Sequence, residues 1–189
     1  MTVSYVEREQ ANDATQAFYD DAEERFELLL NIFKVFGHTP ALGTVFTDMI
    51  MEILKDGEID WVTKELIILK ATHRNECQYC VVQHERLCDM LGMPAEKVAD
   101  IDGVKYRTSP HFTEGEVALL DFCIQIGEDA NRVPKELWDR LHKHWTEPQI
   151  VDACFVITTY IMVSKFGDAL GVELEPMFDG VKPVLTISH

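Results

Sequence analysis

The chain has 189 residues, enough to bury a core without disulfides, and we expect a single domain over residues 1–189. Hydrophobic residues make up 47% of it, which excludes an intrinsically disordered protein. Its 33 acidic residues against 17 basic ones give a net charge of −16, so we expect no nucleic-acid partner and no membrane partner, because both present anionic surfaces.

The N-terminal stretch MTVSYVEREQANDATQ has no basic segment followed by an apolar one, so the sequence predicts no signal peptide. No apolar run reaches the ~18 residues that span a bilayer. We therefore expect a cytoplasmic protein. In that reducing compartment the five cysteines, an odd number, indicate redox chemistry or metal binding rather than a disulfide framework.

Apolar residues recur at helical spacing through most of the chain, which predicts an all-α fold, a helical bundle without strands. Asp60 and Asn75 are predicted to cap the third and fourth helices, and Gly92 to end the fourth. Thr113 with Glu116 forms a predicted capping box. The predicted helices cover residues 13–36, 40–54, 61–74, 76–91, 93–101, 113–128, 134–145 and 147–170.

Two stretches resemble each other, WVTKELIILKATHR…HERLCDMLGM and HWTEPQIVDACFVITTY…SKFGDALGV. Both begin with Trp and Thr, continue through an apolar helix and end in Asp-x-Leu-Gly. An internal helical repeat would explain this, and so would chance, since Leu-Gly is a common helix end.

The predicted fourth helix carries the residues with distinctive chemistry. Cys77, Cys80, His84 and Cys88 are separated by three, four and four residues, so on one helix they form a single stripe. A helix N-terminus favours a thiolate, and an imidazole one turn away accepts a thiol proton. The pattern predicts a nucleophile, a base and a second thiol within disulfide reach.

Two arguments disagree on which cysteine attacks. The helix dipole favours Cys77, the cysteine nearer the helix start. The base favours Cys80, because His84 lies about one turn from Cys80 and about two turns from Cys77. We predict that Cys80 attacks and that Cys77 resolves.

Glu65 opens the apolar stretch ELIILKAT, whose helix should pack against the cysteine helix. A carboxylate on the inner side needs a partner, and His84 is the obvious one. Periodicity alone favours the alternative, an exposed first-turn Glu that interacts with the helix dipole.

The pattern Glu65–x11–Cys77–x2–Cys80–x3–His84, within TKELIILKATHRNECQYCVVQH, resembles the signature of the alkylhydroperoxidase D family in the carboxymuconolactone decarboxylase-like superfamily. The preceding GHTPALGTVF and ILKDGEID resemble its peroxidase-related subgroup. The resemblance is specific over about residues 36–92 and looser over 113–172.

This resemblance implies an all-helical homo-oligomer (dimer, trimer or hexamer) that acts as a thiol peroxidase without a cofactor. Cys80 would be oxidised by a hydroperoxide substrate, Cys77 would close the disulfide, and His84 with Glu65 would relay protons. A reducing dithiol partner, a lipoyl-bearing protein or a peroxiredoxin system, would restore the thiols. One departure is Tyr79, which stands where the family's peroxidase has a relay His; a phenol donates a hydrogen bond but is a poor base.

Three alternatives stay open from the sequence. Zinc could bind Cys77, Cys80, His84 and either Glu65 or Cys88, although three ligands from one helix fit a tetrahedron poorly. A decarboxylase-like or lactone-handling enzyme of the same superfamily would not need the cysteine pair. A redox-sensing or disulfide oxidoreductase module would use the pair without peroxide. The other cysteines, Cys88, Cys123 and Cys154, are expected to be structural. Tyr160 and Lys165 share the predicted helix 147–170, and the sequence gives them no place at the site.

Overall fold

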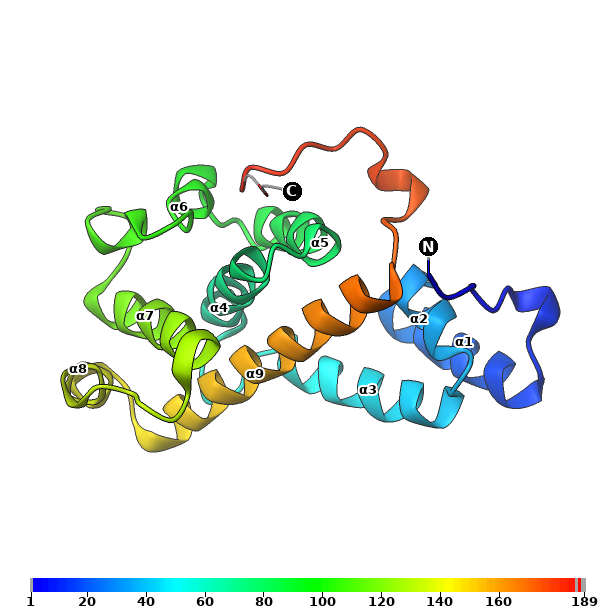
Figure 1. Ribbon diagram of the computed structural model, residues 1–189, viewed down its shortest axis with the longest axis horizontal. Coiled ribbons are helices and arrows are strands. Elements are labelled where there is room, and N and C mark those ends of the chain that lie inside the picture. The colour runs from blue at the N-terminus through cyan, green and yellow to red at the C-terminus, as the bar shows by residue number, and fades with distance from the viewer. Residues whose placement is uncertain (1, 186, 188–189) are drawn as a thin grey trace. The chain divides into compact units, whose positions relative to one another are not determined.

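The computed structural model describes residues 2–185 and 187. It is all-helical, with no strand among those residues, which confirms the predicted fold class (Figure 1). The α-helices are α1 (Asp13–Phe26), α2 (Asn31–Phe36), α3 (Pro40–Ile53), α4 (Trp61–Arg74), α5 (Gln78–Met90), α6 (Ala95–Ala99), α7 (Glu114–Asp129), α8 (Lys135–His144) and α9 (Glu147–Leu170). Three single turns of 3₁₀-helix cover Arg8–Gln10, Lys105–Arg107 and Pro176–Phe178.

The chain forms two compact units. The first comprises the chain up to Lys55 together with Phe166–Gly180, and the second comprises Asp56–Lys165 and the chain from Val181. All of the residues with distinctive chemistry lie in the second unit. The expected single domain over residues 1–189 remains a prediction.

In the first unit, the predicted helix over residues 13–36 is wrong in one respect: it is two helices. α1 ends at Phe26, and its C-cap residue Glu27 has a left-handed backbone, φ +60°. At the start of α2, the backbone N–H of Asn31 donates to Glu175 Oε1 at 2.8 Å. The first N–H groups of a helix have no intrahelical acceptor, so Glu175 supplies one from a distant part of the chain. No local sequence pattern predicts this bond.

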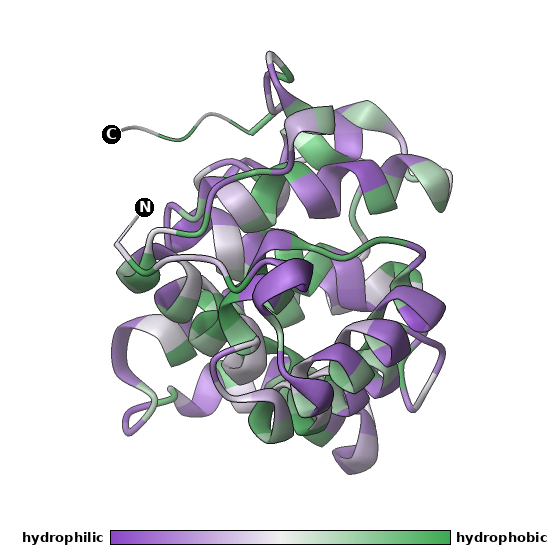
Figure 2. Cartoon of the chain, turned by 90° about the vertical axis from the view of Figure 1, so that its right-hand side faces the viewer, coloured by the Kyte–Doolittle hydropathy of each residue, from purple (hydrophilic) through white to green (hydrophobic). Residues whose placement is uncertain are grey.

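In the second unit, α4 packs against α5 and α7, and α7 packs against α8 (Figure 1). Hydrophilic and hydrophobic residues both occur along the helices (Figure 2). In α4, all ten residues from Thr63 to Thr72 are buried, the polar ones included. One core cluster of this unit consists of Leu66, Leu69, Val81, Cys88, Met93, Val98, Ile101, Tyr106, Leu120 and Leu185.

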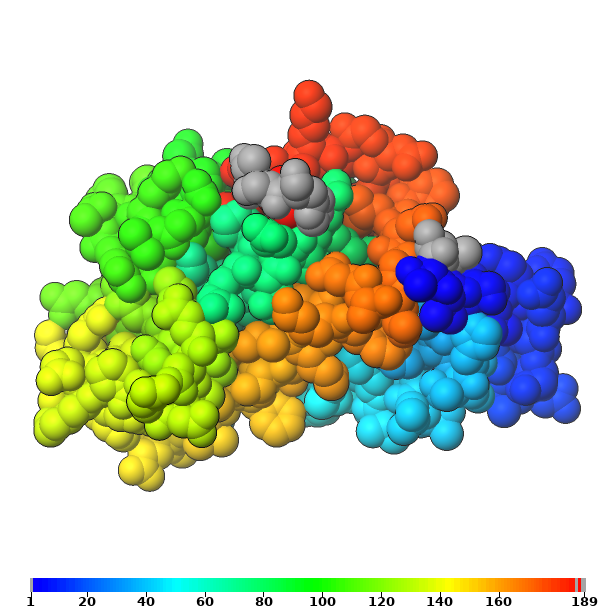
Figure 3. Space-filling model, viewed as in Figure 1, coloured from blue at the N-terminus to red at the C-terminus, as the bar shows by residue number. Residues whose placement is uncertain are grey.

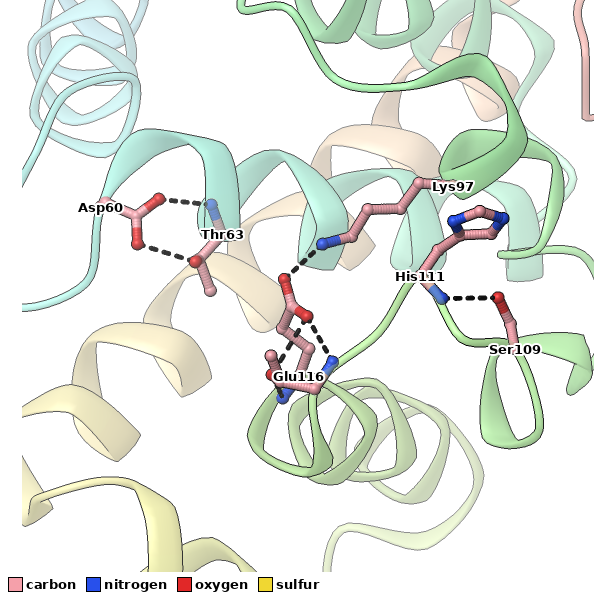
Figure 4. A network of polar contacts seen from close by, with 7 residues as sticks. Asp60, Thr63, Lys97, Ser109, His111 and Glu116 are labelled. Carbon is pink, nitrogen blue, oxygen red and sulfur yellow. Dashed lines mark hydrogen bonds and ion pairs between the residues drawn. The ribbon is translucent and has the colours of Figure 1, made fainter.

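The predicted caps of α4 and α7 are present (Figure 4). Asp60 accepts hydrogen bonds from the backbone N–H and the hydroxyl of Thr63, both at 2.8 Å. Thr113 and Glu116 form the predicted capping box, and Lys97 donates to Glu116 at 2.6 Å, which ties the α6 segment to the start of α7. In the loop before it, the backbone N–H of His111 donates to Ser109 Oγ at 3.1 Å.

The two stretches that suggested a repeat fold differently. The first forms α4, a turn and α5, whereas the second is mostly the uninterrupted helix α9. They share their ends: Gly92 and Gly171 both have positive φ, +75° and +68°, directly after a helix. The Asp-x-Leu-Gly similarity is thus the similarity of two glycine-terminated helices.

From the sequence we expected no apolar run long enough to span a bilayer, and α9 corrects this expectation. Its length and composition alone would allow it to cross a membrane. Half of that apolar window is buried inside the protein, and the core helix of a water-soluble protein has the same composition.

The C-terminal segment contributes to the second unit, where its red atoms reach the green surface in Figure 3. The backbone N–H groups of Val184 and Leu185 donate to the carboxylate of Glu85 on α5, at 2.8 and 2.7 Å. The Leu185 side chain is fully buried in the core cluster. Burial raises the pKa of Glu85, against the lowering effect of these two hydrogen bonds.

Candidate active site

The turn between α4 and α5 places the first cysteine. The backbone N–H of Cys77 donates to the carbonyl of Thr72 at 3.1 Å, and that of Glu76 to the carbonyl of His73 at 3.0 Å. The backbone of Glu76 is left-handed, with φ +58°. These two bonds and the left-handed residue make a Schellman ending of α4, which turns the chain directly into α5.

This geometry corrects the predicted cap of the cysteine helix. Asn75 is the C-cap of α4, and Cys77 itself is the N-cap of α5. Cys80 is then the third residue of α5, within the turn whose backbone N–H groups have no intrahelical acceptor. Both sulfurs therefore lie at the positive end of the helix dipole, where a thiolate is stabilised.

The two thiols are adjacent and shielded from solvent. Cys77 Sγ lies 3.0 Å from Cys80 Sγ, at hydrogen-bond distance with Cys77 as the donor. Both are free thiols, with 0% and 3% of their surface exposed. A donor at this place favours the thiolate form of Cys80, the form that is nucleophilic.

Glu65 and His84 meet across the α4–α5 contact. His84 Nδ1 lies 2.7 Å from Glu65 Oε2. Glu65 is fully buried and His84 is 7% exposed, so the exposed first-turn alternative for Glu65 is wrong. An ionised carboxylate only accepts hydrogen bonds, so a carboxylate in this position pairs with the His tautomer that carries its hydrogen on Nδ1 and has its lone pair on Nε2.

Trp61 reaches the second oxygen of the same carboxylate. Its indole Nε1 donates to Glu65 Oε1 at 2.9 Å. Trp61 is the first residue of α4, and Glu65 follows one turn later. The sequence reasoning missed this residue, although its i, i+4 spacing from Glu65 was a signal that could have found it.

α9 adds two side chains from more than 75 residues further along the chain. The Tyr160 ring stands edge-on to the His84 ring, with centroids 4.8 Å apart and an interplanar angle of 87°. Ser164 Oγ lies 3.9 Å from Cys80 Sγ and donates to the Tyr160 carbonyl at 2.8 Å. Burial, followed by the charges of Glu65 and Cys80, raises the pKa of Tyr160 well above its ordinary value, so its phenol stays protonated.

Tyr79 and Lys165 are the other two residues that the sequence analysis discussed in connection with the site. Tyr79 is the second residue of α5, between the two cysteines, and is 7% exposed. Lys165 is exposed near the end of α9.

The other three cysteines have the surroundings of unreactive thiols. Burial raises the pKa of Cys88, with further contributions from Glu65 and Glu85. Burial raises the pKa of Cys123 to about 12, and it also raises that of Cys154. A neutral thiol is a poor nucleophile.

The sequence left zinc binding open as an alternative. Among residues 2–185 and 187, no group of three or more His, Cys, Asp or Glu side chains is arranged to hold a metal ion.

Part of the chain matches a known protein family. Residues 40–121 match the carboxymuconolactone decarboxylase family. An uncharacterized protein, YdfG of Bacillus subtilis (strain 168), is 25% identical over 118 residues, which cover 62% of this chain and 79% of that protein.

Solved structures share the fold over nearly the whole chain. An uncharacterized peroxidase-related protein with an alkylhydroperoxidase AhpD core, from Ralstonia eutropha JMP134, superposes with a TM-score of 0.79 at 18% identity, covering 94% of this chain and 93% of that one. The debrominase Bmp8 superposes with a TM-score of 0.76 at 19% identity, covering 92% of each chain. The family match and the shared fold confirm the resemblance inferred from the cysteine motif.

Proposed function

We propose that this chain, which matches the carboxymuconolactone decarboxylase family over residues 40–121, is a thiol-dependent hydroperoxide reductase that cycles between the Cys77–Cys80 dithiol and its disulfide. One observation carries the proposal: a buried Glu65–His84 pair, 2.7 Å apart, on the helices that also hold two thiols 3.0 Å apart. In this proposal Cys80 is the nucleophile, His84 the base, Glu65 the orienting carboxylate and Cys77 the resolving thiol.

In the first half-reaction, His84 takes the proton of the Cys80 thiol through Nε2. The Cys80 thiolate attacks the terminal oxygen of the hydroperoxide, so a sulfur–oxygen bond forms as the oxygen–oxygen bond breaks. The departing alkoxide takes the proton from His84 and leaves as the alcohol. Cys80 is oxidised to the sulfenic acid, and Glu65 stabilises the transient imidazolium.

In the second half-reaction, the Cys77 sulfur attacks the sulfur of the sulfenic acid. A disulfide forms, and the hydroxyl leaves with the Cys77 proton as water. An external dithiol then reduces the disulfide and becomes a disulfide itself. We propose a lipoyl-bearing protein or a peroxiredoxin system for this role, in a cytoplasmic homo-oligomer. The cycle calls on no haem, flavin or metal.

A second candidate is reductive removal of a halogen by the same dithiol. Two thiols and one carbon–bromine bond would give a disulfide, a carbon–hydrogen bond and HBr. Two observations favour it: the debrominase Bmp8 shares the fold, and Tyr79 stands where the peroxidase of the family has a relay His. A protonated phenol supplies a hydrogen-bond donor rather than a base at this place.

The proposed function predicts that Cys80→Ser abolishes hydroperoxide consumption, because the serine hydroxyl is not ionised near neutral pH. The measurement adds one equivalent of an organic hydroperoxide to the reduced protein and follows the intact mass. The unmodified protein should lose two hydrogens, mapped to a Cys77–Cys80 bond. Cys154→Ser is the control, and it should behave like the unmodified protein.

Consumption that survives Cys80→Ser would refute the assignment of the nucleophile. If the thiols do not react with hydroperoxide but are oxidised by a brominated pyrrole, the result favours the second candidate instead. The same samples, assayed for zinc, would detect a metal-bound pair.

A further inference from the structure

Glu65 is a fully buried carboxylate, and a buried carboxylate needs hydrogen-bond donors close to its oxygens. Oε2 lies 2.7 Å from His84 Nδ1, at hydrogen-bond distance, and Oε1 accepts from Trp61 Nε1 at 2.9 Å. Trp61 is itself held at its backbone, where its N–H donates to Asp56 Oδ1 at 2.9 Å. The Trp61 indole, the Glu65 carboxylate and the His84 ring thus form a row of polar contacts from α4 to α5.

The direction of the indole hydrogen bond has a chemical consequence. An indole N–H only donates, so it stabilises the ionised carboxylate, which only accepts. An ionised Glu65 must receive the proton of His84 Nδ1, which leaves a lone pair on Nε2. A protonated Glu65 would donate to Nδ1 instead, and the ring hydrogen would move to Nε2, where the ring could then accept no proton.

We propose that Trp61 is a positioning residue that fixes the tautomer of His84 through Glu65. The inference rests on the proposed function, because it concerns the base of the same dithiol site. The titratable groups that interact with Glu65 include His84 and Cys88 on α5 and Tyr160 on α9. Trp61 does not titrate, so its donor is present at every pH.

The test compares two tryptophan variants of the full chain. Trp61→Phe keeps an aromatic ring and removes the donor. Trp145→Phe is the matched control, because Trp145 Nε1 also donates at 2.9 Å, but to the carbonyl of Gly115 at the start of α7. Two readouts are taken: the ¹⁵N shifts of the His84 ring nitrogens, and the rate of Cys80 alkylation by iodoacetamide against pH, mapped by mass.

We expect Trp61→Phe to move the His84 hydrogen from Nδ1 toward Nε2. We also expect Cys80 alkylation near neutral pH to slow about tenfold or more, the size of a lost hydrogen bond to a charged group. Trp145→Phe should change neither readout. Unchanged ring nitrogens and an unchanged alkylation profile in Trp61→Phe, or equal changes in both variants, would overturn the inference.

If Trp61→Phe does not fold, the inference is tested on the unmodified protein instead. Its three tryptophans give three indole N–H signals, assigned with the help of the Trp138→Phe and Trp145→Phe variants. The indole N–H signal of Trp61 should shift together with the His84 ring nitrogens across a pH titration. A Trp61 signal that stays constant while the His84 signals shift would refute the inference. Neither readout uses hydroperoxide, so a protein that fails to consume hydroperoxide would refute the proposed function and leave this test intact.

Discussion

Ser164 brings a hydroxyl to Cys80 from the far end of the chain. The hydroxyl donates to the Tyr160 carbonyl at 2.8 Å, and the sulfur lies further away at 3.9 Å. With a neutral thiol the carbonyl is the better acceptor. A thiolate is a stronger acceptor than a thiol, so ionisation of Cys80 draws the hydroxyl toward the sulfur. At the residue scale, we therefore expect Ser164 to stabilise the thiolate form of Cys80.

This role predicts that Ser164→Ala slows Cys80 alkylation at neutral pH about two- to tenfold, the range of one ordinary hydrogen bond. Thr158→Ala is the control. Its hydroxyl makes the same backbone bond on the same helix, to the Cys154 carbonyl at 2.9 Å, but Thr158 is exposed. Equal rates for the two variants would exclude a contribution of Ser164 to the thiolate.

At the scale of elements, the short turn between α4 and α5 sets the position of the site. It aligns the end of the helix that carries Glu65 with the start of the helix that carries both thiols. The left-handed residue in this turn is Glu76, where glycine would be free of strain. The turn is held instead by its two backbone hydrogen bonds, at 3.0 and 3.1 Å.

We expect Glu76→Gly to stabilise the protein. Relief of the left-handed strain, about 1–2 kcal/mol, exceeds the added entropy of a glycine in the unfolded chain, about 0.5–1 kcal/mol. The free energy of unfolding, measured with urea, should rise by about 0.5–1 kcal/mol. Glu76→Ala removes the carboxylate but keeps the Cβ, so it should not show this gain. A rise of the same size in both variants would assign the effect to charge rather than to backbone strain.

At the scale of the whole molecule, a protein with a net charge of −16 holds some carboxylates in place by specific pairing. Asp121 on α7 accepts from Tyr106 at 2.7 Å, Arg107 at 2.8 Å and Arg140 at 2.6 Å. Burial raises the pKa of Asp121, but these three hydrogen bonds together outweigh burial and hold the pKa below its ordinary value. The cluster connects α7 with the 3₁₀ turn Lys105–Arg107 and with α8.

The lowered pKa fixes the sign of a pH effect. The stability that Asp121 contributes is fully present above its unfolded pKa, near 3.9, and is lost as the pH falls through its lower folded value. Urea unfolding at several pH values should therefore show Asp121→Asn less stable than the unmodified protein at pH 7, with a difference that shrinks below about pH 4. Glu114→Gln, at an exposed ion pair with Lys143, should show no comparable difference. A pH-independent difference for Asp121→Asn would contradict the linkage.

The sequence by itself determined most helices and the spacing of Cys80 and His84 on the cysteine helix. Helical period, the Asp60 cap, the Thr113–Glu116 box and the Gly92 stop act within a few residues, so a short window of sequence contains their physics. The same local spacing put Cys80 and His84 one turn apart on α5. Only the tertiary structure decided that the helix from residue 13 breaks at Glu27, that Glu65 is buried against His84, and that Trp61 and Ser164 reach the site. Each of these features depends on how separate helices pack or on a side chain's rotamer, and spacing along the chain carries no record of which distant group fills a buried space.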